Sequence, residues 1–184
     1  ATTISAGTLA LTGNGSIENS AVDINTTATF DVSGISNGTS VKDIGGSGNI
    51  SLGGKALTLT DASKDTVYSG VASGSGGSII VQGGTESLSG ANTYTGKTVV
   101  ESGAGLNLTG SIAGVLNNDG TTTITGTTDT TGKVAGTTTN TGTLTTNGAN
   151  LSDVVNNNAG IATLTSTTMA AVTNAATATL NMSG

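Results

Sequence analysis

A short motif that returns at a fixed interval constrains this chain more than any other feature of its sequence. Three copies of the triplet Thr-[Ile/Leu]-Thr in the second half of the chain are equally spaced, and a degenerate copy follows them: Thr123-Ile124-Thr125, Thr143-Leu144-Thr145, Thr163-Leu164-Thr165 and Thr179-Leu180-Asn181. An Asn and then a Gly or Ala precede each copy, at Asn118-Asp119-Gly120, Asn140-Thr141-Gly142, Asn158-Ala159-Gly160 and Asn174-Ala175-Ala176. A period of about 20 residues that holds a short strand and a turn is typical of a solenoid.

The rest of the chain shows the same strand pattern, in which apolar and polar residues alternate. Examples are Leu9-Ala10-Leu11, Val22-Asp23-Ile24, Phe30-Asp31-Val32, Ile50-Ser51-Leu52, Leu57-Thr58-Leu59 and Leu106-Asn107-Leu108. Successive side chains of a strand point to opposite faces, so this pattern predicts strands with one apolar face. Helices are disfavoured, because Thr, Asn, Ser and Gly are poor helix formers. Only Met169-Ala170-Ala171-Val172 is compatible with a helical turn.

Stacked coils would allow such a chain to bury its apolar residues. One coil of about 20 residues cannot bury an inward Leu or Ile, whereas coils stacked about 4.8 Å apart pair every strand and align the inward residues. We therefore predict a single all-β domain over residues 1–184. It is a right-handed parallel β-helix (β-solenoid) of roughly nine coils of about 20 residues, roughly 40–45 Å long.

The residue types that the chain lacks exclude several classes of function. It has no Cys, His, Pro or Trp, and all five basic residues are lysines: Lys42, Lys55, Lys64, Lys97 and Lys133. Disulfides, cysteine zinc sites and Ser-His-Asp or Cys-His catalysis are therefore excluded. The net charge of −6 argues against a nucleic-acid partner, which needs a basic surface. We predict no cofactor, no metal and no catalytic residue.

The segment SGANTYTGKT, residues 89–98, looks at first like a phosphate-binding loop. Gly90 and Gly96 enclose five residues, whereas the nucleotide pattern G-x-x-x-x-G-K-[ST] has four. We interpret the segment instead as a strand, a corner and a second strand within one coil. We expect no signal peptide in this sequence, and no membrane-spanning segment, because it has no run of about 18 apolar residues and no aromatic-girdled strands.

A longer stretch around this segment is similar to a known repeat. YSGVASGSGG at residues 68–77 leads to LSGANTYTGKT at residues 88–98 and on to Gly103 and Leu108. The stretch from Tyr68 to Leu108 resembles the passenger-associated repeat of bacterial autotransporters (type V secretion), and TISAGTLAL at residues 3–11 resembles the tail of the same unit. The chain departs from the repeat at Lys97, where the family usually has Gly, and at Glu86-Ser87-Leu88, where it usually has Thr-Leu-Thr-Leu.

The resemblance implies a β-helix passenger that is secreted across the outer membrane of a Gram-negative bacterium and exposed at the cell surface or released. In the family a membrane barrel normally follows the passenger. We expect a non-enzymatic stem that acts as an adhesin or a structural scaffold. Its expected partners are a host cell, a matrix protein, a glycan or further copies of itself, without direct insertion into a membrane.

Two other classes of function stay open. Regular coils expose strand edges at both ends, which favours end-to-end stacking into a filament or a surface array. A polysaccharide lyase or hydrolase is the least favoured, because the chain has neither Arg nor His to supply the usual bases and carboxylate binders.

Most candidate site residues have a simpler structural explanation. Asp61, Lys64 and Asp65 form a charged turn, which we interpret as solvated and not as a calcium or acid–base site. Two further carboxylates, Asp23 and Asp31, lie between apolar neighbours and should point outward. The two tyrosines, Tyr68 and Tyr94, should pack within the repeat.

The outward threonines of the triplets are the sharpest candidate. Equal spacing would stack Thr123, Thr143 and Thr163 in one file, and Thr125, Thr145 and Thr165 in a parallel file. A flat two-column threonine array is what β-solenoid ice-binding proteins present, so ice binding is a further alternative. Thr is also simply a good residue for an exposed strand.

Overall fold

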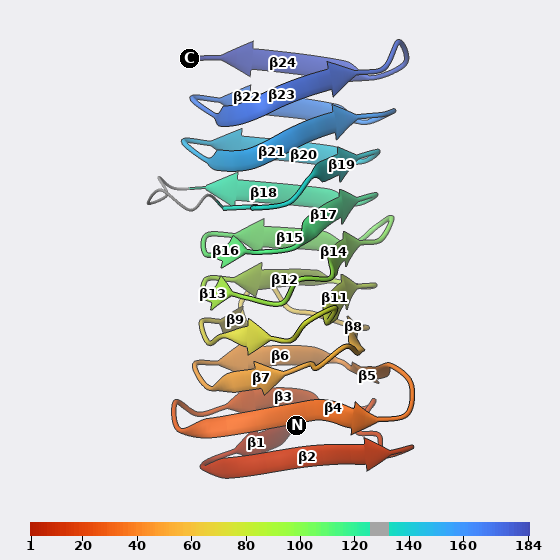
Figure 1. Cartoon of the computed structure of the whole chain (residues 1–184), viewed down its shortest axis with the longest axis vertical. Coiled ribbons are helices and arrows are strands. Elements are labelled where there is room, and N and C mark those ends of the chain that lie inside the picture. Colours follow the sequence, from red (N-terminus) through yellow and green to blue (C-terminus); the bar gives the residue numbers. More distant parts are fainter. Residues whose placement is uncertain (126–132) are drawn as a thin grey trace.

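The chain forms a column of stacked β-coils, with the N-terminal coil at the bottom of Figure 1 and the C-terminal coil at the top. A computed structural model describes residues 1–125 and 133–184. These residues form strands, turns and loops without any helix, and their strands pair in parallel. The prediction of an all-β solenoid of about nine coils, each about 20 residues long, is confirmed.

One sheet, here called the long sheet, runs through every coil. Its strands in order are β1 (Thr2–Ile4), β3 (Ala21–Ile24), β6 (Asp43–Gly46), β9 (Val67–Tyr68), β12 (Thr85–Leu88), β15 (Gly105–Leu108), β18 (Thr121–Thr125), β20 (Thr143–Asn147), β22 (Ile161–Thr165) and β24 (Thr179–Ser183). One strand from each coil thus contributes to a continuous parallel ladder.

The other sides of the coils form shorter sheets. The second sheet contains β5 (Thr39–Val41), β8 (Ala56–Leu59), β11 (Ser78–Val81), β14 (Lys97–Val100), β17 (Val115–Asn118), β19 (Thr138–Asn140), β21 (Asn150–Asn157) and β23 (Thr168–Asn174). A third sheet contains β2 (Gly7–Gly13), β4 (Ala28–Ile35), β7 (Asn49–Ser51) and β10 (Ala72–Ser73). A separate pair of strands is formed by β13 (Ala91–Asn92) and β16 (Ser111–Ile112). Residues 169–172, the possible helical turn, belong to strand β23.

The core lies inside the column, where the inward side chains of successive coils stack. The apolar residues of the alternating segments are buried as predicted; Phe30, Leu57 and Leu108, for example, are 0% exposed. One inward column of the long sheet contains Ile4, Ile24, Gly46, Tyr68, Leu88, Leu108, Ile124, Thr146, Leu164 and Met182. Its steps along the chain are unequal, since Leu108 to Ile124 is shorter than Ile124 to Thr146. The number of residues per coil therefore varies while the column stays aligned.

An asparagine ladder, formed by Asn118, Asn140, Asn157 and Asn174, runs up the second sheet, and all its members except the exposed Asn174 are buried. Each Nδ2 donates to the Oδ1 of the next asparagine, over 2.7, 2.9 and 2.7 Å. The first three side chains are 0% exposed, and each also donates to a backbone carbonyl of the following coil. The sequence motif pointed to Asn158 in the third repeat, but the register places its neighbour Asn157 in the ladder.

A file of corner glycines explains part of the high glycine content. A Cβ on Gly70 would lie 1.8 Å from the carbonyl oxygen of Gly48, and one on Gly90 would lie 1.9 Å from that of Gly70. Gly110 approaches Gly90 in the same way, at 2.1 Å. Successive backbones therefore touch at this corner, and a side chain there would separate the coils.

Candidate functional site

The segment at residues 89–98 is a structural part of its coil. It contains β13, a corner and the start of β14, so the interpretation as strand, corner and strand is confirmed. Asn92 is 2% exposed; its Oδ1 accepts from the Ala72 N–H at 3.0 Å and its Nδ2 donates to the Ser111 carbonyl at 3.3 Å. These two bonds connect the coil to the coils before and after it. Lys97, which suggested a phosphate loop, is exposed.

The two tyrosines are packed in the core, as predicted. Tyr68 is 0% exposed and donates its hydroxyl to the Gly48 carbonyl over 3.0 Å. Tyr94 is also 0% exposed, and its hydroxyl lies 2.5 Å from Thr98 Oγ1. Burial raises the pKa of both phenols above the ordinary value, so they stay neutral at physiological pH. Neither hydroxyl is accessible to a ligand.

The charged turn and the outward carboxylates do not assemble into a site. Lys64 Nζ lies 2.8 Å from Asp65 Oδ1, but the side chains are 71% and 81% exposed, so the pair has little effect on stability. The carboxylate of Asp31 accepts from the Ser33 N–H at 2.9 Å, and hydrogen bonds from Ser33 lower its pKa. In residues 1–125 and 133–184, no three side chains of His, Cys, Asp or Glu gather as metal ligands. No helix there is long and apolar enough to span a membrane.

A buried acid that the sequence analysis did not single out lies in the core of the long sheet. Glu86 is 0% exposed and pairs in register with Leu106, so it occupies an inward position that apolar residues take elsewhere. Among the described residues, no donor reaches either of its carboxyl oxygens. The available signal was the motif itself, because Glu86 lies in the segment where the chain departs from the autotransporter repeat.

Asp43 is the neighbour of this buried acid. It lies on β6 and is 5% exposed, and its Oδ1 accepts from the Ile44 N–H at 3.0 Å. The strand between β6 and β12 is β9, which is only two residues long, so no strand pairing separates Asp43 from Glu86. Burial, and then the Asp43 carboxylate beside it, raises the pKa of Glu86 well above its ordinary value. A proton on Glu86 would supply a donor between the two carboxyl groups.

The threonine array exists in a different register from the predicted one. The ladder pairs Thr123 with Thr145 and Thr145 with Thr163, so the two predicted files are wrong. The reason is coil length, because the step from Thr123 to its partner is longer than the step that follows it, whereas the prediction assumed equal steps. Neighbouring files contain Thr121, Thr143 and Ile161 on one side, and Thr125, Asn147 and Thr165 on the other.

The six candidate threonines do face outward. Each is half-buried and alternates along its strand with a buried inward residue such as Ile124, Leu144 or Leu164. The central file continues into Asn107 below and Asn181 above, and Ile161 in the adjacent file is 49% exposed. The outer face of these coils is therefore a mixed surface of Thr, Asn and Ser with one exposed Ile, and it lacks two uninterrupted threonine columns.

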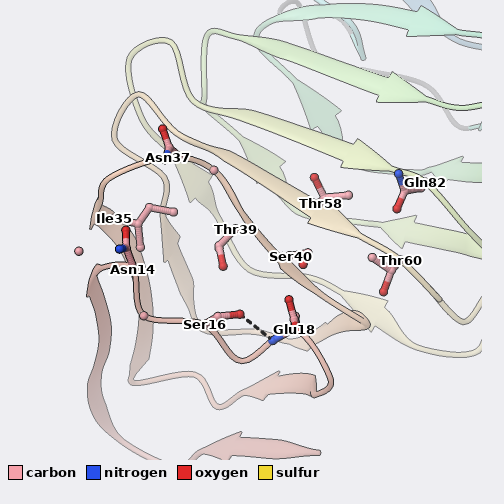
Figure 2. Close-up of a pocket in the computed structure, with 13 residues that line it drawn as sticks. Asn14, Ser16, Glu18, Ile35, Asn37, Thr39, Ser40, Thr58, Thr60 and Gln82 are labelled. Atoms are coloured by element: carbon pink, nitrogen blue, oxygen red, sulfur yellow. Dashed lines mark hydrogen bonds between the residues drawn. The ribbon is translucent and has the colours of Figure 1, made fainter.

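A polar pocket of about 470 Å³, here called the edge pocket, lies at the start of the second sheet (Figure 2). The turn after β2 and the loop between β4 and β5 form two of its walls, and residues of β5 and β8 form another. It exists because β5 is the edge strand of the second sheet and residues 14–20 of the preceding coil form no strand to cover it. The side chains of its lining include Asn14, Ser16, Glu18, Asn37, Ser40, Thr58, Thr60 and Gln82.

Most polar groups of the edge pocket are free to bind something else. The Glu18 backbone N–H donates to Ser16 Oγ at 3.2 Å, and Thr60 Oγ1 donates to the Val41 carbonyl at 3.3 Å. The side chains of Asn14, Asn37 and Gln82 have no hydrogen bond within the described part of the chain. The described residues that line the pocket include no lysine and no aromatic residue.

Comparisons of the chain with protein-family models, with curated proteins and with solved structures give no match. The similarity of residues 68–108 to the autotransporter repeat therefore rests on the sequence motif alone.

Proposed function

We propose that this chain is a non-enzymatic stem of a protein displayed by a Gram-negative bacterium, acting as an adhesin or a structural scaffold at the cell surface. The observation that carries the proposal is how the repeat-like stretch lies in the fold. Tyr68, Leu88 and Leu108 share one inward column at equal intervals along the chain, so the stretch spans two complete coils. Its Asn92 and Tyr94 are buried structural residues. The motif therefore builds coils, which is the role of a stem repeat.

The distribution of chemical groups supports the non-enzymatic part of the proposal. The sequence contains neither His nor Arg. Asp61 and Asp65 are exposed in one turn, Asp23 is exposed on a strand of an earlier coil, and the acid pair of Asp43 with Glu86 is buried. A stem needs a regular ladder and a polar outer surface, and the chain provides both.

Labelling of intact cells tests the cellular location. An antibody raised against the purified chain is applied to intact cells of the source bacterium, with and without external protease, and to lysed cells. We expect intact cells to be labelled and the label to be lost after protease treatment. Labelling that appears only after lysis would refute a surface stem.

Two binding and activity assays test the role itself. Beads coated with the purified chain are incubated with host cells and with matrix proteins, and uncoated beads serve as the control; retention supports an adhesin, and its absence leaves the scaffold role. The chain is also incubated with polysaccharides, and the release of new reducing or unsaturated ends is measured. Turnover that persists in protein purified by two independent routes would contradict the proposal.

A further inference from the structure

The edge pocket concentrates unused hydrogen-bonding capacity. An Asn or Gln side chain offers two N–H donors and a carbonyl acceptor. Asn14, Asn37 and Gln82 bring three such amides to the lining, all exposed and without a partner in the described part of the chain. Figure 2 shows Asn14 and Asn37 at one end of the pocket and Gln82 at the other, with hydroxyl side chains between them. All three residues belong to the lining of the edge pocket.

The fold fixes the backbone positions of these three residues. Asn14 follows the end of β2, Asn37 lies in the loop before β5, and Gln82 directly follows β11. Gly38 in the same loop is packed closely, since a Cβ there would lie 2.9 Å from the Ala56 carbonyl oxygen. The loop backbone therefore lies directly against β8, and the pocket has a wall that is formed before a ligand arrives.

The charge and polarity of the lining select the class of ligand. Glu18 is the only charged residue among the described residues of the lining, so a phosphate, a sulfate or another anion would meet a carboxylate and no cation within the lining. The only large apolar side chain is Ile35, which is 3% exposed, so an apolar ligand would gain little contact. A ligand with adjacent hydroxyl groups, which both donate and accept hydrogen bonds, matches amides, hydroxyls and one carboxylate.

From these observations we propose that the edge pocket binds a neutral saccharide, with Asn14, Asn37 and Gln82 bonding its hydroxyl groups. The volume of about 470 Å³ lies within the range of small-molecule sites, about 300–1,000 Å³. The absence of an aromatic platform in the lining predicts modest affinity, dominated by hydrogen bonds. A biological role for this saccharide in adhesion rests on the function proposed above. Binding of the saccharide by the purified chain does not depend on that function.

A glycan array tests the proposal directly. The purified chain is applied to a printed array of neutral, sialylated and sulfated oligosaccharides, and the best neutral probe is then titrated in solution. We expect neutral saccharides to be retained in preference to the anionic ones. Asn37→Ala should weaken binding about five- to tenfold, because one amide is lost. Asn37 is exposed and unbonded, so this variant should keep its fold.

Asn158→Ala is the matched control, since Asn158 is also an exposed asparagine and lies outside the pocket. It should bind like the unmodified chain. An array that retains no neutral saccharide, a preference for sulfated or sialylated probes, or equal affinity of the Asn37 and Asn158 variants would each overturn the proposal. Failure of the surface labelling, by contrast, would refute the stem and leave this binding result standing.

Discussion

Replacing the buried acid Glu86 by Leu is expected to make the protein more stable at neutral pH. Glu86 is 0% exposed, is paired in register with Leu106 and has no donor at either carboxyl oxygen. Leu has a similar volume and is already the residue at the paired position of the next coil. The substitution therefore removes a desolvated acid without opening a cavity.

The size and sign of the effect follow from proton binding. Burial, with Asp43 nearby, raises the pKa of Glu86 in the folded protein, while the unfolded chain has the ordinary pKa of about 4.3. The folded state thus binds the proton more tightly than the unfolded chain does. The resulting contribution to the free energy of unfolding is fully present below about pH 4.3. As the pH rises from there towards the folded pKa, stability falls by about 1.4 kcal/mol per pH unit. Two unmade hydrogen bonds suggest a gain of about 1–3 kcal/mol for Leu at neutral pH.

Denaturant unfolding followed by circular dichroism, between about pH 4 and pH 8, measures this effect. The unmodified chain should lose stability over this range, and Glu86→Leu should lose less. Asp43→Asn should narrow the pH range over which stability falls, because it lowers the folded pKa of Glu86. The fall should persist, because burial is the larger cause of the raised pKa. Tyr68 and Tyr94, the other titratable groups near Glu86, stay neutral throughout. Stability that rises with pH in the unmodified chain, or a Leu variant with the same slope, would refute the reasoning.

Three substitutions test the packing of the coils, each by denaturant unfolding. Asn140→Ala breaks the asparagine ladder and should cost about 2–4 kcal/mol, whereas Asn156→Ala, on the outer face of β21, should cost less than about 0.5 kcal/mol. Gly70→Ala should abolish native stacking, because its Cβ would overlap the Gly48 carbonyl, while Gly54→Ala should be neutral or slightly stabilising. Tyr94→Phe removes the bond to Thr98 and should cost about 1–2 kcal/mol. Equal effects of a substitution and its control would contradict the stacking described.

The sequence predicted the class of fold well, because the fold depends on features that a single chain carries locally. Period-two alternation determined which residues of segments such as Leu57-Thr58-Leu59 face inward, and these are buried. The regular return of the strand-and-turn motif indicated that strands stack in parallel. The alternation and the repeated motif can both be recognised in the sequence without knowing the conformation of the corners.

The register and the buried acid could not be predicted from the same signals. Counting equal triplets placed Thr123 over Thr143, whereas the ladder pairs it with Thr145, because successive coils differ in their number of residues. The number of residues per coil varies, so equal triplet spacing does not give the register of the ladder. The edge pocket was missed for a related reason, since it depends on where the second sheet begins. Glu86 was visible as a departure from the repeat, but its burial was not.

The asparagine ladder and the strand ladders have a mechanical consequence. Their hydrogen bonds run from coil to coil, for example from Asn118 to Asn140 and from Asn140 to Asn157. A pulling force along the column would therefore load the bonds of one coil interface at a time, and the column would peel open instead of breaking at once. Each coil of about 20 residues that detaches would release roughly 65–70 Å of chain, against an axial rise of about 4.8 Å. Under tension the column would thus act as a stepwise extensible shock absorber.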